Sequence, residues 1–104
     1  MFKVSVMYPN QAGARFDLAY YCTTHMDLVR RHLQAFGLVK TEVLKGLSGG
    51  GGQPAPYVCI GNLYFETAEG YEKGGAASGG ALRADIPNFT DLTPVRQISE
   101  VVAA

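Results

Sequence analysis

The sequence predicts an α+β domain of the ferredoxin-like class, with the element order β-α-β-β-α-β and two helices on one face of a four-stranded antiparallel sheet. Two observations lead to this class. Apolar residues alternate in short segments that are typical of strands, and longer segments with helical spacing lie between them. The length of 104 residues suits one domain of ordinary size, so residues 1–104 are expected to fold as a single unit.

The first strand is expected at residues 2–8, where apolar side chains alternate up to Pro9. The first helix is expected from Asp17, a suitable N-cap, to about Phe36, with Gly37 as a left-handed C-cap. When this segment is wound as a helix at about 100° per residue, several mainly apolar side chains fall in one stripe along it. Its members, with His25 near the middle, are Leu18, Tyr21, Cys22, His25, Val29, His32 and Phe36.

The second and third strands are expected at residues 38–47 and 57–65, joined by the glycine-rich connection 48–56. No Gly-Lys-Ser/Thr motif follows these glycines and no helix begins there. We therefore interpret the connection as part of a hairpin and not as a phosphate-binding loop.

A second helix is expected to begin at Thr67 or Ala68 and to end before Pro87. It contains five glycines, each of which costs up to about 1 kcal/mol relative to alanine, and together they could leave this helix broken or mobile. These glycines are Gly70, Gly74, Gly75, Gly79 and Gly80. The last strand is expected at residues 93–102.

The third strand is apolar on both faces, and two helices can cover only one face of the sheet. Its two sets of side chains are Cys59, Leu63 and Phe65 on one face and Val58, Ile60 and Tyr64 on the other. A second copy of the sheet would cover the other face. We therefore predict a homodimer whose sheets meet face to face and form a dimeric α+β barrel.

Composition and motifs argue against several classes of protein and of binding site. The formal net charge is zero, which argues against nucleic acid as a partner. Cys22 and Cys59 lie in apolar runs and are interpreted as two buried thiols of a cytoplasmic protein, because no signal peptide or membrane-spanning run is present. The sequence has no CxxC motif, dinucleotide-binding motif, nucleophile elbow or metal-ligand spacing, so neither a metal nor a cofactor is expected.

Several pieces of the sequence resemble the EthD family, which belongs to the dimeric α+β barrel group. They are Tyr8-Pro-Asn, Gly13-Ala-Arg-Phe-Asp17, Tyr20-Tyr21 before Thr24-His25-Met26, Pro56-Tyr57, and Ala84-Asp-Ile-Pro-Asn-Phe-Thr-Asp91. The resemblance implies the same fold and dimer. It also implies an association with catabolic gene sets, including ether degradation beside a monooxygenase system, and with cofactor-free chemistry in a cavity between sheet and helices.

His25 is the candidate catalytic residue, because imidazole can move a proton near neutral pH without a metal. The alternative is a core histidine bonded to a backbone carbonyl or an aspartate. Candidate ligand-binding residues are Tyr8, Asn10, Tyr21, Tyr57, Asp85 and Asn88. The tyrosines could equally be core or rim residues, and the last two residues could orient His25 or form a turn.

The leading functional hypothesis is acid/base chemistry at His25 on a small, largely apolar organic molecule in a catabolic oxidoreductase pathway. The alternative is a non-catalytic binding or accessory protein that serves a monooxygenase system. Ligand-induced stabilisation that survives loss of His25, without product formation, would distinguish the second from the first.

Overall fold

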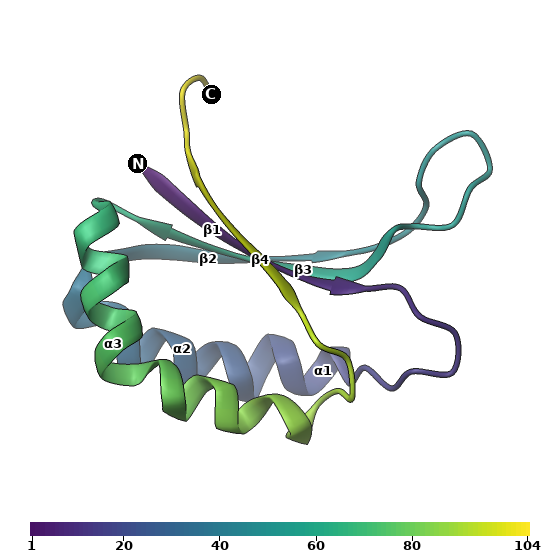
Figure 1. The fold of residues 1–104 in the computed structure, drawn as a ribbon, viewed down its shortest axis with the longest axis horizontal. Coiled ribbons are helices and arrows are strands. Elements are labelled where there is room, and N and C mark those ends of the chain that lie inside the picture. The colour runs from purple at the N-terminus through teal and green to yellow at the C-terminus, as the bar shows by residue number, and fades with distance from the viewer.

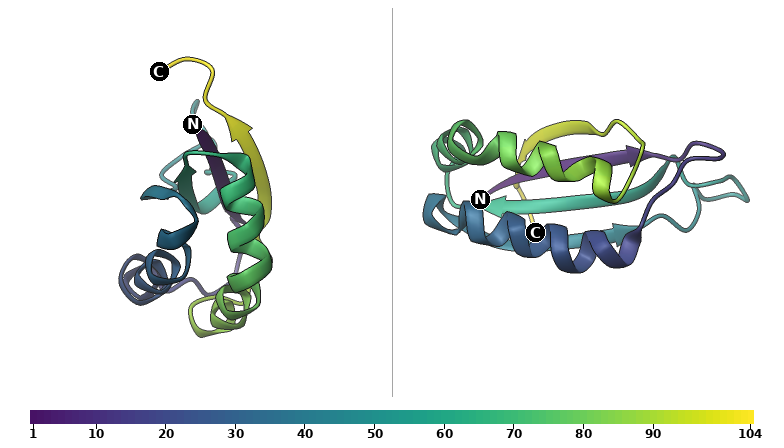
Figure 2. Two further views of the ribbon diagram at one scale, coloured as in Figure 1. Left: turned by 90° about the vertical axis from the view of Figure 1, so that its left-hand side faces the viewer. Right: turned by 90° about the horizontal axis from the view of Figure 1, so that it is seen from below.

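The computed structural model describes all 104 residues and has the predicted order of strands and helices. The strands are β1 (Phe2–Pro9), β2 (Leu38–Lys45), β3 (Tyr57–Phe65) and β4 (Val95–Glu100). They form one antiparallel sheet in the order β2-β3-β1-β4. The helices lie side by side on one face of this sheet, and the β2–β3 connection projects from its end (Figure 1, Figure 2). The predicted ferredoxin-like fold is confirmed.

The first helical segment is continuous and consists of four parts. They are α1 (Leu18–Tyr20), the π turn η1 (Tyr21–His25), α2 (Met26–Leu33) and the 3-10 turn η2 (Gln34–Phe36). The Asp17 carboxylate accepts a hydrogen bond from the Tyr20 backbone N–H at 3.0 Å, and Gly37 ends the segment with a φ of 87°. Both caps predicted from the sequence are confirmed.

The π turn changes which residues face the core. The Met26 backbone N–H donates to the Tyr21 carbonyl oxygen, five residues earlier. A π turn takes more residues than an α turn, so it shifts the residues before it relative to a uniform α-helical winding. Tyr21 is therefore buried while its neighbour Cys22 is exposed. The prediction that Cys22 is a buried thiol is wrong, whereas Cys59 is buried, and desolvation raises the pKa of its thiol to about 12.

Helix α3 (Ala68–Asp85) is continuous, so its glycines do not break it, a possibility that the sequence left open. The Thr67 hydroxyl caps it by accepting a backbone N–H at 3.0 Å. A Cβ added at Gly74 would lie 2.9 Å from Leu33 Cδ2 and 3.2 Å from Phe36 Cβ. The glycine thus lets α3 approach the first helical segment closely, and the packing offsets part of its poor helix propensity. The 3-10 turn η3 (Ile86–Asn88) follows.

The last strand is shorter than the predicted range of 93–102. Glu100 pairs with Phe2, where β1 begins, so almost no partner backbone remains beyond it. At the other end, Pro94 has no backbone N–H to donate to a neighbouring strand. Strand β2 likewise ends two residues before its predicted end.

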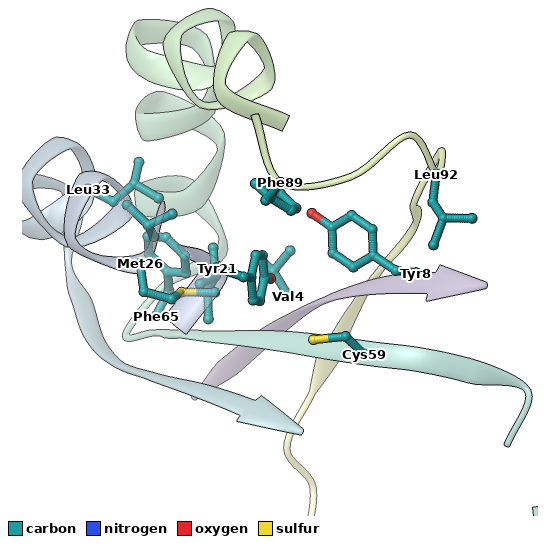
Figure 3. Packing of buried hydrophobic residues seen from close by; sticks show 11 residues of the cluster. Val4, Tyr8, Tyr21, Met26, Leu33, Cys59, Phe65, Phe89 and Leu92 are labelled. Atoms are coloured by element: carbon teal, nitrogen blue, oxygen red, sulfur yellow. The ribbon is translucent and has the colours of Figure 1, made fainter. Parts of the chain in front are cut away.

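The hydrophobic core fills the space between the sheet and the helices. Its buried side chains are Val4, Tyr8, Tyr21, Met26, Val29, Leu33, Cys59, Leu63, Phe65, Phe89 and Leu92. Phe89, which follows η3, lies over the sheet with its ring centroid 5.8 Å from that of Tyr8 (Figure 3). The residues that follow α3 therefore cover the core next to the start of η1.

Candidate functional site

A hydrogen bond between two helices holds the His25 side chain. The π turn directs His25 inward, where only 6% of the residue is exposed. Its Nδ1 lies 2.8 Å from Oδ2 of Asp85, the last residue of α3. Of the two partners that the sequence left open for a core histidine, the structure has the aspartate.

Asp85 accepts further hydrogen bonds on its other oxygen. The Tyr20 hydroxyl donates to Oδ1 at 2.7 Å, and Asn88 Nδ2 donates to the same oxygen at 2.9 Å. Desolvation raises the pKa of the Asp85 carboxyl, but the hydrogen bonds from Asn88, His25 and Tyr20 outweigh it and hold that pKa below its ordinary value. The carboxyl is therefore ionised at neutral pH and can only accept hydrogen bonds.

This environment fixes the roles of the two ring nitrogens of His25. An ionised Asp85 requires that His25 Nδ1 carries the hydrogen, so in the neutral ring Nε2 is the unprotonated nitrogen. No protein group hydrogen-bonds Nε2. Every fully buried side-chain nitrogen or oxygen in the molecule has a hydrogen-bond partner, so Nε2 is not fully buried. Nε2 must therefore be reachable by solvent. His25 lines a cavity, which supplies that access.

The cavity lies between the sheet and the two helical segments and has a volume of about 320 Å³. Its wall is mainly apolar, with a few polar groups. The lining residues are Val4, Val6, Tyr8, Tyr21, His25, Met26, Val29, Leu33, Leu63, Tyr71, Glu72, Gly75, Gly79, Leu82, Arg83, Ile86 and Arg96. A space of this size and character suits a small organic molecule.

Aromatic rings surround His25. The Tyr21 ring is stacked on the imidazole, with centroids 5.3 Å apart and planes 15° apart, and the Phe89 ring lies 4.7 Å away. Gly61 of β3 makes this arrangement possible, because a Cβ there would overlap the Tyr21 hydroxyl. Burial raises the pKa of both Tyr8 and Tyr21 above its ordinary value, which already lies well above neutral pH. Both hydroxyls are therefore protonated and can donate hydrogen bonds.

The comparison with solved structures decides the family. The chain is 42% identical to an EthD-like protein from Ralstonia eutropha, across 98% of this chain and 92% of that chain, with a TM-score of 0.91. The chain belongs to the EthD-like family. The resemblance inferred from the sequence is thereby confirmed. A scan against family models and a search of curated proteins gave no match.

Two more distant structures share the fold alone with this EthD-like chain. A dimeric ferredoxin-like protein from an uncultured marine organism is 17% identical, covers 100% of this chain and 97% of its own, and has a TM-score of 0.61. SnoaB, a cofactor-independent oxygenase from Streptomyces nogalater, is 12% identical, with coverages of 99% and 93% and a TM-score of 0.53.

The structure brings together only some of the residues that the sequence singled out in this EthD-like chain. Tyr8, Tyr21 and His25 line the cavity, and Asp85 lies behind His25 with Asn88 bonded to it.

Four of the six candidate ligand-binding residues do not line the cavity: Asp85 and Asn88, which lie behind His25, and Asn10 and Tyr57. Asn10 is exposed, and its side-chain amide donates to the Ala55 carbonyl at 2.9 Å, which ties the end of β1 to the hairpin connection. Tyr57 is half-buried at the start of β3, opposite Pro9.

Sequence reasoning missed several members of the site. Arg83 and Arg96 both line the cavity, and the Tyr20 hydroxyl donates a hydrogen bond to Asp85. For Arg96 a signal was present: it lies two positions before the apolar Ile98 in a strand, so both side chains belong to one face. For Arg83 and Tyr20 only the packing of the helices supplies the information.

Two further properties of the chain bear on partners. The structure contains no group of three or more His, Cys, Asp or Glu side chains placed to bind a metal ion. None of its helices combines the length and apolar character that crossing a membrane requires.

Proposed function

We propose that this EthD-like chain is a cofactor-independent enzyme that binds a small, largely apolar organic molecule and transforms it by proton transfer at His25. It would act in a catabolic oxidoreductase pathway such as ether degradation. The observation that carries the proposal is the bond from His25 Nδ1 to Asp85, which leaves Nε2 free beside an apolar cavity. The likeness in fold to a cofactor-independent oxygenase supports it as well.

The proposed chemistry uses the two ring nitrogens differently. Nε2 would take a proton from an acidic C–H or O–H group of the ligand, and the bonding electrons would remain on the ligand as an enolate or a related oxyanion. The Asp85 carboxylate would stabilise the imidazolium through Nδ1–H. His25 would then return the proton to another atom of the ligand, or of its product. A ligand that fills the cavity would displace water from the apolar wall, and this would strengthen these interactions.

A His25→Gln variant tests the catalytic role. Glutamine retains a polar group of similar reach but cannot act as a base near neutral pH. We expect a folded variant that binds ligand and supports turnover about 10²–10⁴-fold more slowly, measured as pathway flux in cells that carry the variant in place of the wild type. His32→Gln, on the same helical segment but outside the cavity, is the matched control and should retain full turnover.

Two outcomes of this test differ in meaning. Full turnover by a folded His25→Gln variant would contradict the catalytic role. If ligands also raised the melting temperature of that variant as they do the wild type, the protein would be a binding or accessory protein of a monooxygenase system.

We also propose that the chain forms a homodimer through the sheet face that carries no helix. An apolar row crosses this face, because Met7 pairs with Ile60 and Val95, and Ile60 pairs with Leu44. Leu44 is 44% exposed and Val95 is 50% exposed in the single chain. The dimeric ferredoxin-like structure of similar fold supports this assembly. The cytoplasmic location expected from the sequence stays a prediction.

A further inference from the structure

The mouth of the cavity carries two arginines that form no ion pair. Arg83 of α3 and Arg96 of β4 line the cavity beside His25 and also a second, more open cavity of about 390 Å³. Ile86 is the other residue common to both, so the two arginines lie at the boundary between the enclosed space and the surface. None of the ion pairs in the molecule includes either arginine. Their charges are therefore available to a bound molecule.

The Arg83 side chain folds back along its own helix towards the cavity. A Cβ added at Gly79 would lie 3.1 Å from Arg83 Nη1, so the guanidinium lies directly over this glycine. Gly79 itself lines the cavity. The absence of a side chain at this position therefore gives the Arg83 guanidinium its place at the cavity wall.

Arg96 places its charge near Tyr8 in the same cavity. It pairs with Val6, on the sheet face that the helices cover, and Tyr8 is the next cavity residue along β1. Burial raises the pKa of the Tyr8 hydroxyl, and the positive charge of Arg96 lowers it by a smaller amount. The Arg96 charge is thus close enough to influence a group that faces the interior.

The one carboxylate on the cavity wall lies away from Arg83. Glu72 also lines the cavity, but eleven positions separate it from Arg83 on α3. At about 1.5 Å per residue, this corresponds to about 16 Å along the helix axis. The apolar residues Val29, Leu33 and Leu63 belong to the same wall. The cavity wall therefore has a cationic mouth, a mainly apolar body and one carboxylate far from Arg83. The Asp85 carboxylate lies behind His25, where hydrogen bonds from His25, Tyr20 and Asn88 hold it.

From this arrangement, and resting on the proposed function, we propose that the ligand is an amphiphilic organic anion. Its carboxylate, or an oxyanion of similar geometry, binds between Arg83 and Arg96, and its hydrocarbon or aromatic body lies along the apolar wall. Guanidinium groups suit this role because they bind carboxylates through paired N–H donors. Anchoring the charged end at the mouth would leave the body of the ligand beside His25.

Binding of 2-naphthoate and of its neutral analogue 2-naphthamide, measured by isothermal titration calorimetry, tests this inference. The two probes share one aromatic body and differ in charge. We expect the wild type to bind the naphthoate at least about fivefold more tightly. Arg83→Gln and Arg96→Gln should each weaken naphthoate binding at least about fivefold and leave naphthamide binding within about twofold. Arg31→Gln, on the exposed face of α2, is the control and should change neither.

The outcomes separate the inference from the proposed function. If naphthamide binds as tightly as naphthoate, or if the arginine variants weaken both probes equally, the preference for anions is overturned while an apolar binding site remains. If neither probe binds the wild type, the inference and the proposed ligand-binding function both fail. Higher salt should weaken the binding of naphthoate alone, because it screens the charges at the open mouth.

Discussion

His25 Nδ1 lies 2.8 Å from Asp85 Oδ2, although 60 positions separate the two residues in the sequence. The bond joins the π turn of the first helical segment to the last turn of α3. It therefore depends on how the two helical segments pack against each other. The same bond occupies Nδ1 and leaves Nε2 as the ring nitrogen that is open to the cavity.

Replacing Asp85 by Asn should change the tautomer of His25. An amide can donate as well as accept, so it no longer requires the hydrogen to be on Nδ1. In ¹⁵N-detected NMR spectra of the imidazole, we expect a protonated Nδ1 and an unprotonated Nε2 in the neutral wild-type ring, and a mixture in Asp85→Asn. Asp27→Asn, on the exposed face of α2, is the control and should leave the wild-type pattern unchanged. An identical pattern in Asp85→Asn would contradict the role of the carboxylate.

Stability at acid pH should depend on Asp85. Its pKa is lower in the folded chain than its ordinary value, so the ionised form favours folding. This contribution is fully present above the ordinary aspartate pKa of about 3.9 and is lost as the pH falls through the lowered value. Urea denaturation between about pH 6 and pH 3 should therefore show a steeper loss of stability for the wild type than for Asp85→Asn. Parallel pH profiles would contradict this prediction.

Gly61→Ala should destabilise the protein by displacing Tyr21. The added Cβ would overlap the Tyr21 hydroxyl and lie 3.2 Å from Met26 Cε, so we expect a loss of about 1–3 kcal/mol in the free energy of unfolding. Tyr21→Phe removes the overlapping hydroxyl, so the double variant should be more stable than the sum of the two single changes predicts. Urea denaturation of all four proteins measures this coupling, and additivity within about 0.5 kcal/mol would contradict it.

Gly75→Leu should fill the cavity. Gly75 lines the cavity, and a Cβ added there would have no neighbour within 4 Å. We expect binding of 2-naphthamide to weaken at least about tenfold, while helix propensity raises the free energy of unfolding by up to about 1 kcal/mol. Gly80→Leu is the matched control, because Gly80 has equally open space but lies outside the cavity. Unchanged binding by Gly75→Leu would place the ligand elsewhere.

Ile60→Glu should dissociate the proposed dimer. The substitution places a charge in the apolar row of the uncovered sheet face, where an interface with a second sheet would bury it. We expect the wild type to sediment as a dimer at micromolar concentration and a folded Ile60→Glu variant as a monomer. Val95→Lys, at a more exposed position of the same row, should have the same effect if Ile60→Glu fails to fold. Ala76→Glu, at an exposed position of α3, should remain dimeric.

A monomeric wild type at that concentration would contradict the homodimer. So would a folded variant, with either Ile60→Glu or Val95→Lys, that remains dimeric. In both cases the exposed apolar row would need another partner.

Much of the fold follows from local sequence patterns. The order of the elements could be predicted because apolar side chains repeat with the period of a strand or of a helix. The caps at Asp17 and Gly37 could be predicted because few residue types satisfy the backbone at helix ends. His25 was expected on the inner stripe, and it is buried there.

Other features could not be predicted from local patterns. The π turn exposes Cys22 and was not foreseen, because a uniform winding does not include it. The sequence left the continuity of α3 open, because helix propensity counts the cost of glycine but not the close packing that Gly74 permits against Leu33. Contacts between distant segments overrode the local preference in α3.

The sequence by itself determined the class of fold, the family and the inward position of His25, because periodicity, caps and short motifs are properties of neighbouring residues. The tertiary structure decided what His25 can do. Only the packing of α3 against the first helical segment brings Asp85 to Nδ1, and only the cavity beside them brings Arg83 and Arg96 to one mouth. Such contacts join residues far apart in the chain, so no local pattern encodes them.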